Sequence, residues 1–379
     1  MKIDDKTSHN SPSIRFPEFT GEWEKCKIED ITDAVSSGKS KNHFSNGEYN
    51  LYGSTGIIGR TDKALYDGKL VLVARVGANA GFLQIINEPC GITDNTLILK
   101  PKGIDAFYLY YFLQHFNLNR LIFGSGQPLI TGGMLKKVKV SLGTISEQSK
   151  IVKFLSLLDE RIAVQSRLID RLQSLIKGIM VKLQQQGLSK GTWKRVPLSS
   201  ILKERTELNE GLLPVYSVSV SQGVVNQMEY LGRSFAAKDT SKYHVAHFGD
   251  LIYTKSPTGS FPYGIVKQNS NRYKVAVSPL YGVYTPANYF TGVFLQEYFK
   301  SEVNTFNYLH SLIQKGAKNT INITNQRFLD NYILIPTDSN DLQQISNLLL
   351  RLNAKKDLMQ NMLQQYQEQK QYLLRQMFI

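Results

Sequence analysis

The sequence lacks the residues on which several classes of protein depend. Only two of its 379 residues are cysteine, Cys26 and Cys90, and they form no CxxC pair, which argues against a disulfide framework or a cysteine zinc site and favours a reducing compartment. No apolar run is long enough to cross a bilayer. Residues 1–7 are polar, unlike a secretory signal. We therefore expect a cytoplasmic protein that does not associate with membranes.

The motifs of common catalytic sites are absent as well. The sequence has no HExxH or GxSxG motif and no Asn-Pro-Pro-aromatic tetrapeptide of the kind that amino-methyltransferases use. The run 53–61 has one residue too many between its glycines, and arginine in place of lysine, to be a phosphate-binding loop. His244 and His247 stand three apart in a strand-like run, which places them on opposite faces and argues against a metal site. We predict that the chain is not an enzyme and has no cofactor of its own.

Positive charge is in surplus. The chain has 45 lysines and arginines against 31 acidic residues, a formal net charge of +14, which favours a polyanionic partner. Its 20 tyrosines and 18 phenylalanines are interleaved with cations in loop-like stretches such as 39–44 and 238–244. Such stretches can contact phosphates and base edges together. The composition therefore favours a nucleic acid as partner.

Two segments with heptad patterning divide the chain. In each, seam residues recur at alternating steps of four and three, which keeps one seam on one face of a long helix. A helix of roughly 40 residues is some 60 Å long, which suits a spacer. Two seams of equal length predict an antiparallel pair that bury each other, with Lys356 and Lys370 making the middle of the second seam less dry. The seam positions are Ile151, Leu155, Leu158, Ile162, Gln165, Ile169, Leu172, Ile176, Ile179 and Leu183, then Ile345, Leu349, Leu352, Lys356, Met359, Leu363, Tyr366, Lys370, Leu373 and Met377.

The segments before these helices repeat each other. The only two tryptophans, Trp23 and Trp193, open the two copies, and a glycine followed by a β-rich run that ends on a cation occurs at 68–75 and at 249–255. The offset between copies grows from about 170 residues at the tryptophans to about 194 at the helices, so the second copy carries insertions, which accumulate in surface loops. We predict an α+β protein with two duplicated globular domains separated by two long helices that form an antiparallel coiled coil. The predicted boundaries are 1–20 for an N-terminal segment, 21–143 and 189–336 for the domains, and 144–188 and 337–379 for the helices.

Three motifs occur in order along the first half. They are residues 15–19 followed by 21–23, residues 124–131 before a short helix, and residues 147–152 opening the long helix. With the second half repeating the layout, the chain resembles the specificity subunit of Type I restriction-modification systems across nearly its whole length. The second half departs from the motifs at 316–319 and 341–344, so its resemblance lies in the layout.

The resemblance implies two target-recognition domains and no catalysis by this chain. It implies a bipartite target in double-stranded DNA, two modification subunits that use S-adenosylmethionine and, through them, two restriction subunits that use ATP and Mg²⁺. Two readers on a spacer would contact two half-sites and leave the base pairs between them unread. The outer helix faces, with Lys153, Asp159, Arg161 and Arg167, are expected to be free for partner subunits. Two alternatives stay open: the specificity subunit of a type IIB-like system, and a coiled-coil protein-binding scaffold.

Candidate DNA contacts are polar, cationic and tyrosine side chains in loop-like stretches of each domain. Arginine, lysine, asparagine and glutamine are suited to base edges in the major groove. Residues 75–81 are expected to form a turn that presents two of these side chains, because their glycine spacing does not fit a dinucleotide-binding fingerprint. The candidates are Lys39, Lys41, Tyr52, Arg60, Arg75, Asn79 and Gln127 in the first domain, and Tyr216, Gln222, Lys242, Lys255, Tyr263, Lys318 and Asn319 in the second.

Overall fold

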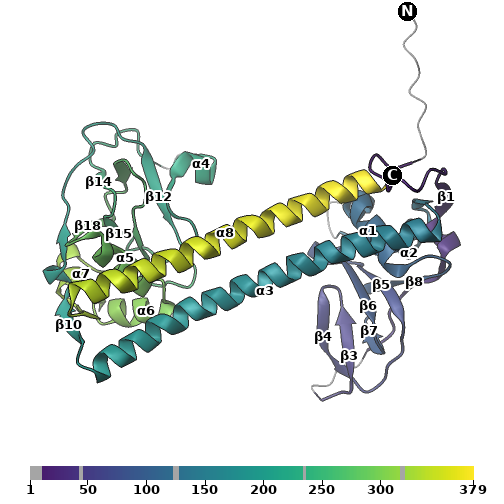
Figure 1. Ribbon diagram of the computed structural model, residues 1–379, viewed down its shortest axis with the longest axis horizontal. Helices are drawn as coiled ribbons and strands as arrows, with labels where there is room; N and C mark the ends of the chain where they lie inside the picture. Colours follow the sequence, from purple (N-terminus) through teal and green to yellow (C-terminus); the bar gives the residue numbers. More distant parts are fainter. Residues whose placement is uncertain (1–10, 42–45, 123–127, 234–235, 316–320) are drawn as a thin grey trace, which may run out of the picture. The chain divides into compact units, whose positions relative to one another are not determined.

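The chain folds into two compact units, which are described one at a time. The computed structural model describes residues 11–41, 46–122, 128–233, 236–315 and 321–379. Unit 1 comprises residues 1–166 and 361–379, and unit 2 comprises residues 167–360 (Figure 1). Each unit contains a sheet-rich body and a part of both long helices. Among the helices of the described residues, none is both long and apolar enough to span a membrane.

Unit 1 is built on two small antiparallel or mixed sheets and a strand pair. The larger sheet has the strand order β2-β8-β5-β6, the smaller has the order β4-β3-β7 with β3 and β7 parallel, and β1 pairs with β9. Helix α1 packs on the larger sheet, and α2 precedes β9. The elements are β1 (Glu24–Lys27), β2 (Thr32–Ser37), β3 (Tyr49–Gly53), β4 (Gly56–Thr61), β5 (Lys69–Ala74), β6 (Leu83–Asn87), β7 (Cys90–Ile92), β8 (Thr96–Pro101), α1 (Ala106–Phe116), α2 (Gly132–Lys136) and β9 (Lys139–Leu142).

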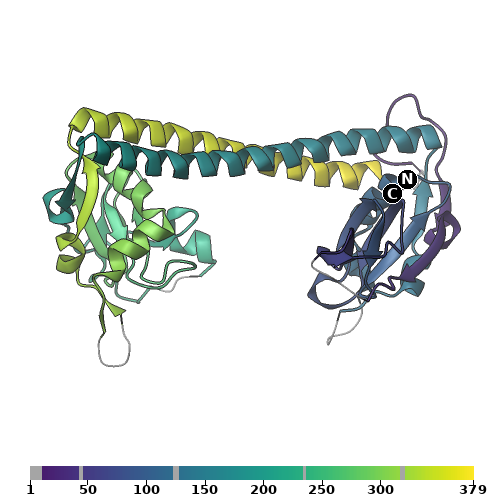
Figure 2. The same ribbon diagram turned by 90° about the horizontal axis from the view of Figure 1, so that it is seen from below.

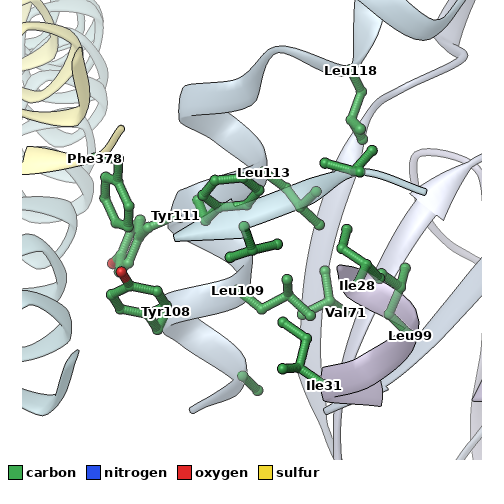
Figure 3. Close-up of a cluster of buried hydrophobic side chains, with 14 of the residues drawn as sticks. Ile28, Ile31, Val71, Leu99, Tyr108, Leu109, Tyr111, Leu113, Leu118 and Phe378 are labelled. Carbon is green, nitrogen blue, oxygen red and sulfur yellow. The ribbon is translucent and has the colours of Figure 1, made fainter. Parts of the chain in front are cut away.

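The core of unit 1 forms between α1 and the larger sheet. Leu109 and Leu113 of α1 lie toward Val71 and Leu99 of the sheet, whereas Tyr108 and other aromatics of α1 lie on the side of the C-terminal residues (Figure 3). Residues 70–74 of β5 are all buried, since helix and sheet cover both faces of this central strand. Each fully buried large side chain stabilises the fold by roughly 1.5–3 kcal/mol.

Unit 2 repeats the strand orders of unit 1. Its larger sheet has the order β11-β18-β15-β16, its smaller sheet has the order β13-β12-β17-β14, and β10 pairs with β21. The elements are β10 (Trp193–Pro197), β11 (Leu202–Glu204), β12 (Val215–Ser219), β13 (Gly223–Asn226), α4 (Gln227–Leu231), β14 (His244–Ala246), β15 (Leu251–Tyr253), β16 (Val266–Gln268), β17 (Val275–Val277), β18 (Gly282–Pro286), α5 (Tyr289–Phe299), α6 (Glu302–His310), β19 (Gln314–Lys315), β20 (Ile321–Asn322), α7 (Asn325–Asp330) and β21 (Tyr332–Pro336).

The predicted duplication is confirmed by these matching sheets. Strands β2, β8, β5 and β6 correspond in order to β11, β18, β15 and β16, and β4, β3 and β7 correspond to β13, β12 and β17. Helices α1 and α5 both have 11 residues and both follow the sheet strand next to the edge strand, β8 or β18. Unit 2 adds β14, α4 and α6, which contribute to the growing offset between the copies.

Two long helices follow the two sheet-rich bodies, as predicted. They are α3 (Ile145–Ser189) and α8 (Ser339–Met377), and Figures 1 and 2 show them side by side. All 20 predicted seam positions are buried or half-buried. In unit 1 the pair is antiparallel, since Asp159 contacts Lys370 and Arg161 lies over the ring of Tyr366. Within this unit, therefore, Asp159 and Arg161 are engaged by α8, and the expectation that they are free was wrong.

The motifs behind the resemblance meet at the start of α3. The Glu147 side chain is fully buried, and its carboxylate accepts hydrogen bonds from Arg15 at 2.6 and 2.8 Å and from Trp23 Nε1 at 3.1 Å. Lys150 pairs with Glu18 and lies over the ring of Phe16. The N-terminal segment is thereby fixed to the helix, because a buried carboxylate needs charged partners.

The corresponding junction in unit 2 is apolar. Trp193 packs against the ring of Phe294 at 5.6 Å and against the end of α3, where a Cβ at Gly187 would lie 2.0 Å from the indole. Asp341, at the position of Glu147, is exposed. The departure of residues 341–344 from the sequence motif thus reflects a junction that binds its tryptophan without a carboxylate.

Candidate nucleic-acid interface

Four of the candidates in unit 1 are exposed to solvent: Lys39, Lys41, Arg60 and Asn79. Lys39 and Lys41 flank Ser40, which is buried and whose hydroxyl accepts a hydrogen bond of 3.0 Å from the backbone N–H of Ile92. This bond anchors the loop to β7 between the two lysines. Both lysine side chains are exposed, and their role as phosphate contacts stays a prediction.

Arg60 has a structural use for its guanidinium. It donates hydrogen bonds of 2.5 Å to the carbonyl oxygens of Gly47 and Glu48, and one of 3.3 Å to Asn50 Oδ1. The side chain is exposed, but these bonds hold the segment before β3 against β4. Its prediction as a DNA contact stays a prediction, with fewer donors to spare than the sequence suggested.

The predicted turn at 75–81 is present. A short 3₁₀ helix covers Gly77–Asn79, and Gly77 and Gly81 have positive φ angles of 79° and 88°, which glycine adopts without strain. Asn79 is exposed, whereas Arg75 is half-buried with its guanidinium 3.4 Å from Ser37 Oγ. The backbone of this turn bonds to the segment that carries Pro128 and Ile130. The turn therefore lies beside residues 128–130. Gln127 falls outside the described residues.

In unit 2 the candidates are spread over several loops. Gln222 and Lys242 are exposed, Tyr263 is half-buried, and Lys318 and Asn319 lie outside the described residues. Lys255 is half-buried with φ at 58°, the left-handed region that is strained for a residue other than glycine. Burial lowers the pKa of its ammonium group. Strain and desolvation at one cation are common features of binding loops.

The tyrosines at equivalent places in the two units each bind one polar side chain. Tyr52 donates a hydrogen bond of 2.6 Å to Glu88 Oε1, which also accepts one of 2.8 Å from Asn50. Tyr216 is 6% exposed, and its hydroxyl lies 2.6 Å from that of Tyr273. Sequence reasoning found both scaffold tyrosines but missed Glu88 and Tyr273, which lie 36 and 57 residues further along the chain.

The two histidines considered for metal binding have other partners. His244 Nδ1 lies 2.9 Å from the carbonyl oxygen of Tyr281, and His247 Nε2 lies 2.6 Å from Glu207 Oε2. Glu207 also accepts a hydrogen bond of 2.9 Å from Lys274. The bond from Lys274, followed by that from His247, lowers the pKa of the Glu207 carboxyl. Across the described ranges, no group of three histidine, cysteine or acidic side chains is arranged to hold a metal ion.

Comparisons with known proteins agree with this architecture. Residues 20–174 match the family described as Type I restriction modification DNA specificity domain. The chain is 28% identical over 112 residues to the Type I restriction enzyme EcoprrI specificity subunit of Escherichia coli, a match that covers 29% of this chain and 28% of that protein. It is 29% identical over 168 residues to the MjaVIII specificity subunit of Methanocaldococcus jannaschii, covering 41% and 39%. The chain therefore aligns with well under half the length of these two relatives.

The fold matches over nearly the whole chain. The crystal structure of the Type I restriction-modification system S subunit from M. genitalium superimposes with a TM-score of 0.67 at 15% identity, covering 97% of this chain and 99% of that one. Two sheet-rich domains, each followed by a long helix, define this class of fold. Residues 20–174 are thus similar in sequence to the specificity domain of Type I restriction-modification systems, and the fold of nearly the whole chain is similar to that of one such S subunit. The resemblance inferred from its motifs is confirmed.

Proposed function

We propose that this chain is the DNA-specificity subunit of a Type I restriction-modification complex and reads a bipartite target, one half-site with each unit. The observation that carries the proposal is a scaffold used twice with different surfaces. The strand orders of the two sheets agree, yet unit 2 inserts β14, α4 and α6 between shared strands. Shared frameworks with unlike loops are expected of two readers of unequal sequences. The net charge of +14 supports binding to DNA.

In this proposal the chain supplies sequence choice and no chemistry. Methyl transfer from S-adenosylmethionine belongs to two modification subunits, and hydrolysis of ATP with Mg²⁺ belongs to two restriction subunits that bind through them. Incubation of the purified chain with DNA and labelled S-adenosylmethionine should leave the DNA unlabelled. Label above background that co-purifies with this chain would contradict the assignment.

The outer face of α3 supports the binding of modification subunits. In unit 1, Leu157 and Val164 stand seven residues apart and are 57% and 39% exposed, and in unit 2 Leu168 and Leu175 repeat this spacing at 43% and 53%. In each unit these side chains form a second apolar row at heptad spacing, on one flank of the seam that α8 covers, and such a row suits contact with further helices. We assign this row to the modification subunits.

The experiment that tests the proposal reads the target directly. The chain is expressed with its modification subunit in a host that lacks other methylation, and the methylated motifs are found by genome-wide sequencing. One bipartite motif is expected. Replacement of residues 189–336 by the equivalent domain of a relative should then change one half-site and leave the other intact. A motif without two separated parts, or a swap that changes both parts, would contradict the proposal.

A further inference from the structure

One position of the shared scaffold lies beside a tyrosine in both units but carries a different side chain in each. Strands β3 and β12 each pair antiparallel with the next strand and parallel with a later one, β7 or β17. Tyr52 lies opposite Ile92 in the first pairing, and Tyr216 lies opposite Val277 in the second. The two tyrosines are therefore structurally equivalent.

The side chains that these tyrosines bind are equivalent too. Glu88 stands four residues before Ile92, and Tyr273 stands four residues before Val277. Each approaches its scaffold tyrosine to the same oxygen-to-oxygen distance of 2.6 Å. The framework thus fixes one position beside its tyrosine, filled by a carboxylate in unit 1 and by a phenol in unit 2.

The carboxylate in unit 1 is held by one of its two oxygens. Oε1 of Glu88 accepts the bonds from Tyr52 and Asn50, and none of the described residues donates a hydrogen bond to Oε2. Burial, followed by the bond to Glu88, raises the pKa of Tyr52 to about 12, so the phenol stays a donor. The bonds from Asn50 and Tyr52 lower the pKa of Glu88, so the carboxylate is ionised at neutral pH. The half-buried side chain therefore presents a fixed, charged acceptor.

The position in unit 2 offers a different group. Tyr273 is 56% exposed, and its ring packs edge-to-face on that of Tyr216 with centroids 6.2 Å apart. Bonding to Tyr273 and burial raise the pKa of Tyr216 to about 12, with burial the larger cause. A phenol held in this way is neutral and can both donate and accept. Unlike Glu88, it has no charge that selects for donors.

We propose that the position of Glu88 in unit 1 and Tyr273 in unit 2 is a base-reading position of the two readers. In unit 1, Glu88 Oε2 accepts a hydrogen bond from the exocyclic amino group of a cytosine or an adenine. In unit 2, Tyr273 contacts the corresponding base of the other half-site through its hydroxyl. Tyr52, Asn50 and Tyr216 are positioning residues, which fix the direction of the reading group. This inference rests on the proposed function.

An acidic side chain adds little to the affinity of a basic domain for DNA, because the phosphates repel its carboxylate. Two neutral donors nevertheless orient Glu88, and the charge of Arg60 acts on it without an ion pair between the two side chains among the described residues. A carboxylate that lowers the affinity for DNA in general can still raise the preference for one base over another, which is what a recognition residue does. The same framework position would then distinguish the two half-sites by one side chain each.

The decisive variant is Glu88→Gln, assayed in the complex with the modification subunit by sequencing of methylated motifs. The amide keeps a carbonyl oxygen for Tyr52 and Asn50 and turns the second oxygen into an N–H donor. One position of one half-site should lose its preference for an amino-bearing base by roughly 5- to 150-fold, in favour of guanine or thymine. The other half-site should stay unchanged. Tyr273→Phe should relax one position of that other half-site only.

Two further variants keep the test decisive. Tyr52→Phe leaves the carboxylate without one support, so the same base should be preferred by a smaller ratio. Glu48→Gln, an exposed neighbour in unit 1, should leave the motif unchanged. If Glu88→Gln is as thermally stable as the parent and methylates the same motif, or loses methylation at all sequences alike, the inference is wrong. That result would not affect the proposed function. The proposed function fails separately, if the complex with the parent chain yields no bipartite motif.

Discussion

Lys370 Nζ lies 2.6 Å from Asp159 Oδ1 in unit 1, at a point where the heptad pattern calls for an apolar residue. The Lys370 side chain is 12% exposed, and its ammonium group also lies over the ring of Tyr111, 5.4 Å from the centroid. The second carboxylate oxygen of Asp159 accepts a hydrogen bond of 2.8 Å from the Tyr111 hydroxyl. The lysine is thus neutralised inside the helix pair by a residue of α3 and an aromatic of α1.

This pair predicts an asymmetric response to substitution. Asp159→Asn should lower the free energy of unfolding by roughly 1–3 kcal/mol, because it leaves a mostly buried ammonium group unpaired. Lys370→Leu should cost less, since leucine suits the seam and Asp159 can turn to water. The double variant should match Lys370→Leu alone. Urea denaturation measures all three, with Glu160→Gln as an exposed control; additive effects would show that the two residues do not interact.

The burial of Phe378 predicts that this side chain contributes strongly to the free energy of unfolding of unit 1. Its ring is 3% exposed and lies 5.2 Å from that of Tyr108 and 6.4 Å from that of Phe112 (Figure 3). Phe378→Ala should destabilise unit 1 by roughly 3–5 kcal/mol. Ile379→Ala, at a position that is 43% exposed, should stay within about 0.5 kcal/mol of the parent.

Fluorescence can report on this change in unit 1 alone. Trp23 and Trp193 are the only tryptophans and belong to different units. In a Trp193→Phe background, denaturation followed at Trp23 should shift for Phe378→Ala and not for Ile379→Ala. An unshifted Trp23 transition in Phe378→Ala would contradict the placement of this ring in the core.

Lys267 in β16 predicts a dependence of stability on pH. Burial, and then the nearby charges of Lys300 and Lys356, lower its pKa to about 8, while Glu297 opposes them. Below pH 8 the ammonium group is charged in both the folded and unfolded states, and its burial destabilises the fold. Between about pH 8 and the unfolded value of 10.5 the folded state binds fewer protons, so this cost is relieved as the pH rises.

Lys267→Met should therefore be more stable than the parent by roughly 1–3 kcal/mol at pH 7, and the difference should shrink above pH 8. The single hydrogen bond lost is that to the carbonyl oxygen of the exposed Val220, which water can replace. Chemical denaturation at pH 7, 8, 9 and 10 measures the difference, with the exposed Lys203→Met as control. A difference that is constant with pH would mean that Lys267 does not titrate in this range.

The exposed row on α3 predicts where partner binding is lost. Leu168→Lys and Leu175→Lys place charges on the face assigned to the modification subunit, so each should weaken co-purification with that subunit at least tenfold, on the order of the cost of a buried unpaired charge. The fold should keep its stability, since both positions are exposed. Ser174→Lys adds the same charge to a neighbouring exposed position and should bind normally. Equal loss in all three would indicate a general electrostatic effect.

Periodic features of the fold were predictable from the sequence. The heptad seam depends only on spacing along one helix, and all its positions proved buried or half-buried, including Lys356 and Lys370. The two lysines that interrupt the second seam lie in different surroundings. Lys370 pairs with Asp159 of α3, whereas Lys356 pairs with the adjacent Asp357 and lines a cavity of about 440 Å³ in unit 2 beside Met180 and Lys300.

The contents of the candidate interface were less predictable. Tyr52 and Tyr216 were singled out because their local sequences match, but their partners are set by parallel pairing with β7 and β17, which no local pattern reports. Tyr216 proved buried because it packs in a cluster with Val224, Ile252 and Val277. Glu88 and Tyr273 each stand two residues before the first residue of the strand that pairs in parallel with the tyrosine's strand, so knowledge of that pairing would have found both.

The backbone N–H of Ile14 donates a hydrogen bond of 2.9 Å to the carbonyl oxygen of Gln376, so unit 1 is assembled from two distant stretches of chain. Unit 2 is one continuous stretch, residues 167–360. During synthesis, domains generally fold as units once their residues have emerged from the ribosome. The unit that is made first must therefore wait for its last helical residues until the unit made second is complete. A chain truncated after residue 360 should accordingly hold a protease-resistant unit 2 and an unfinished unit 1.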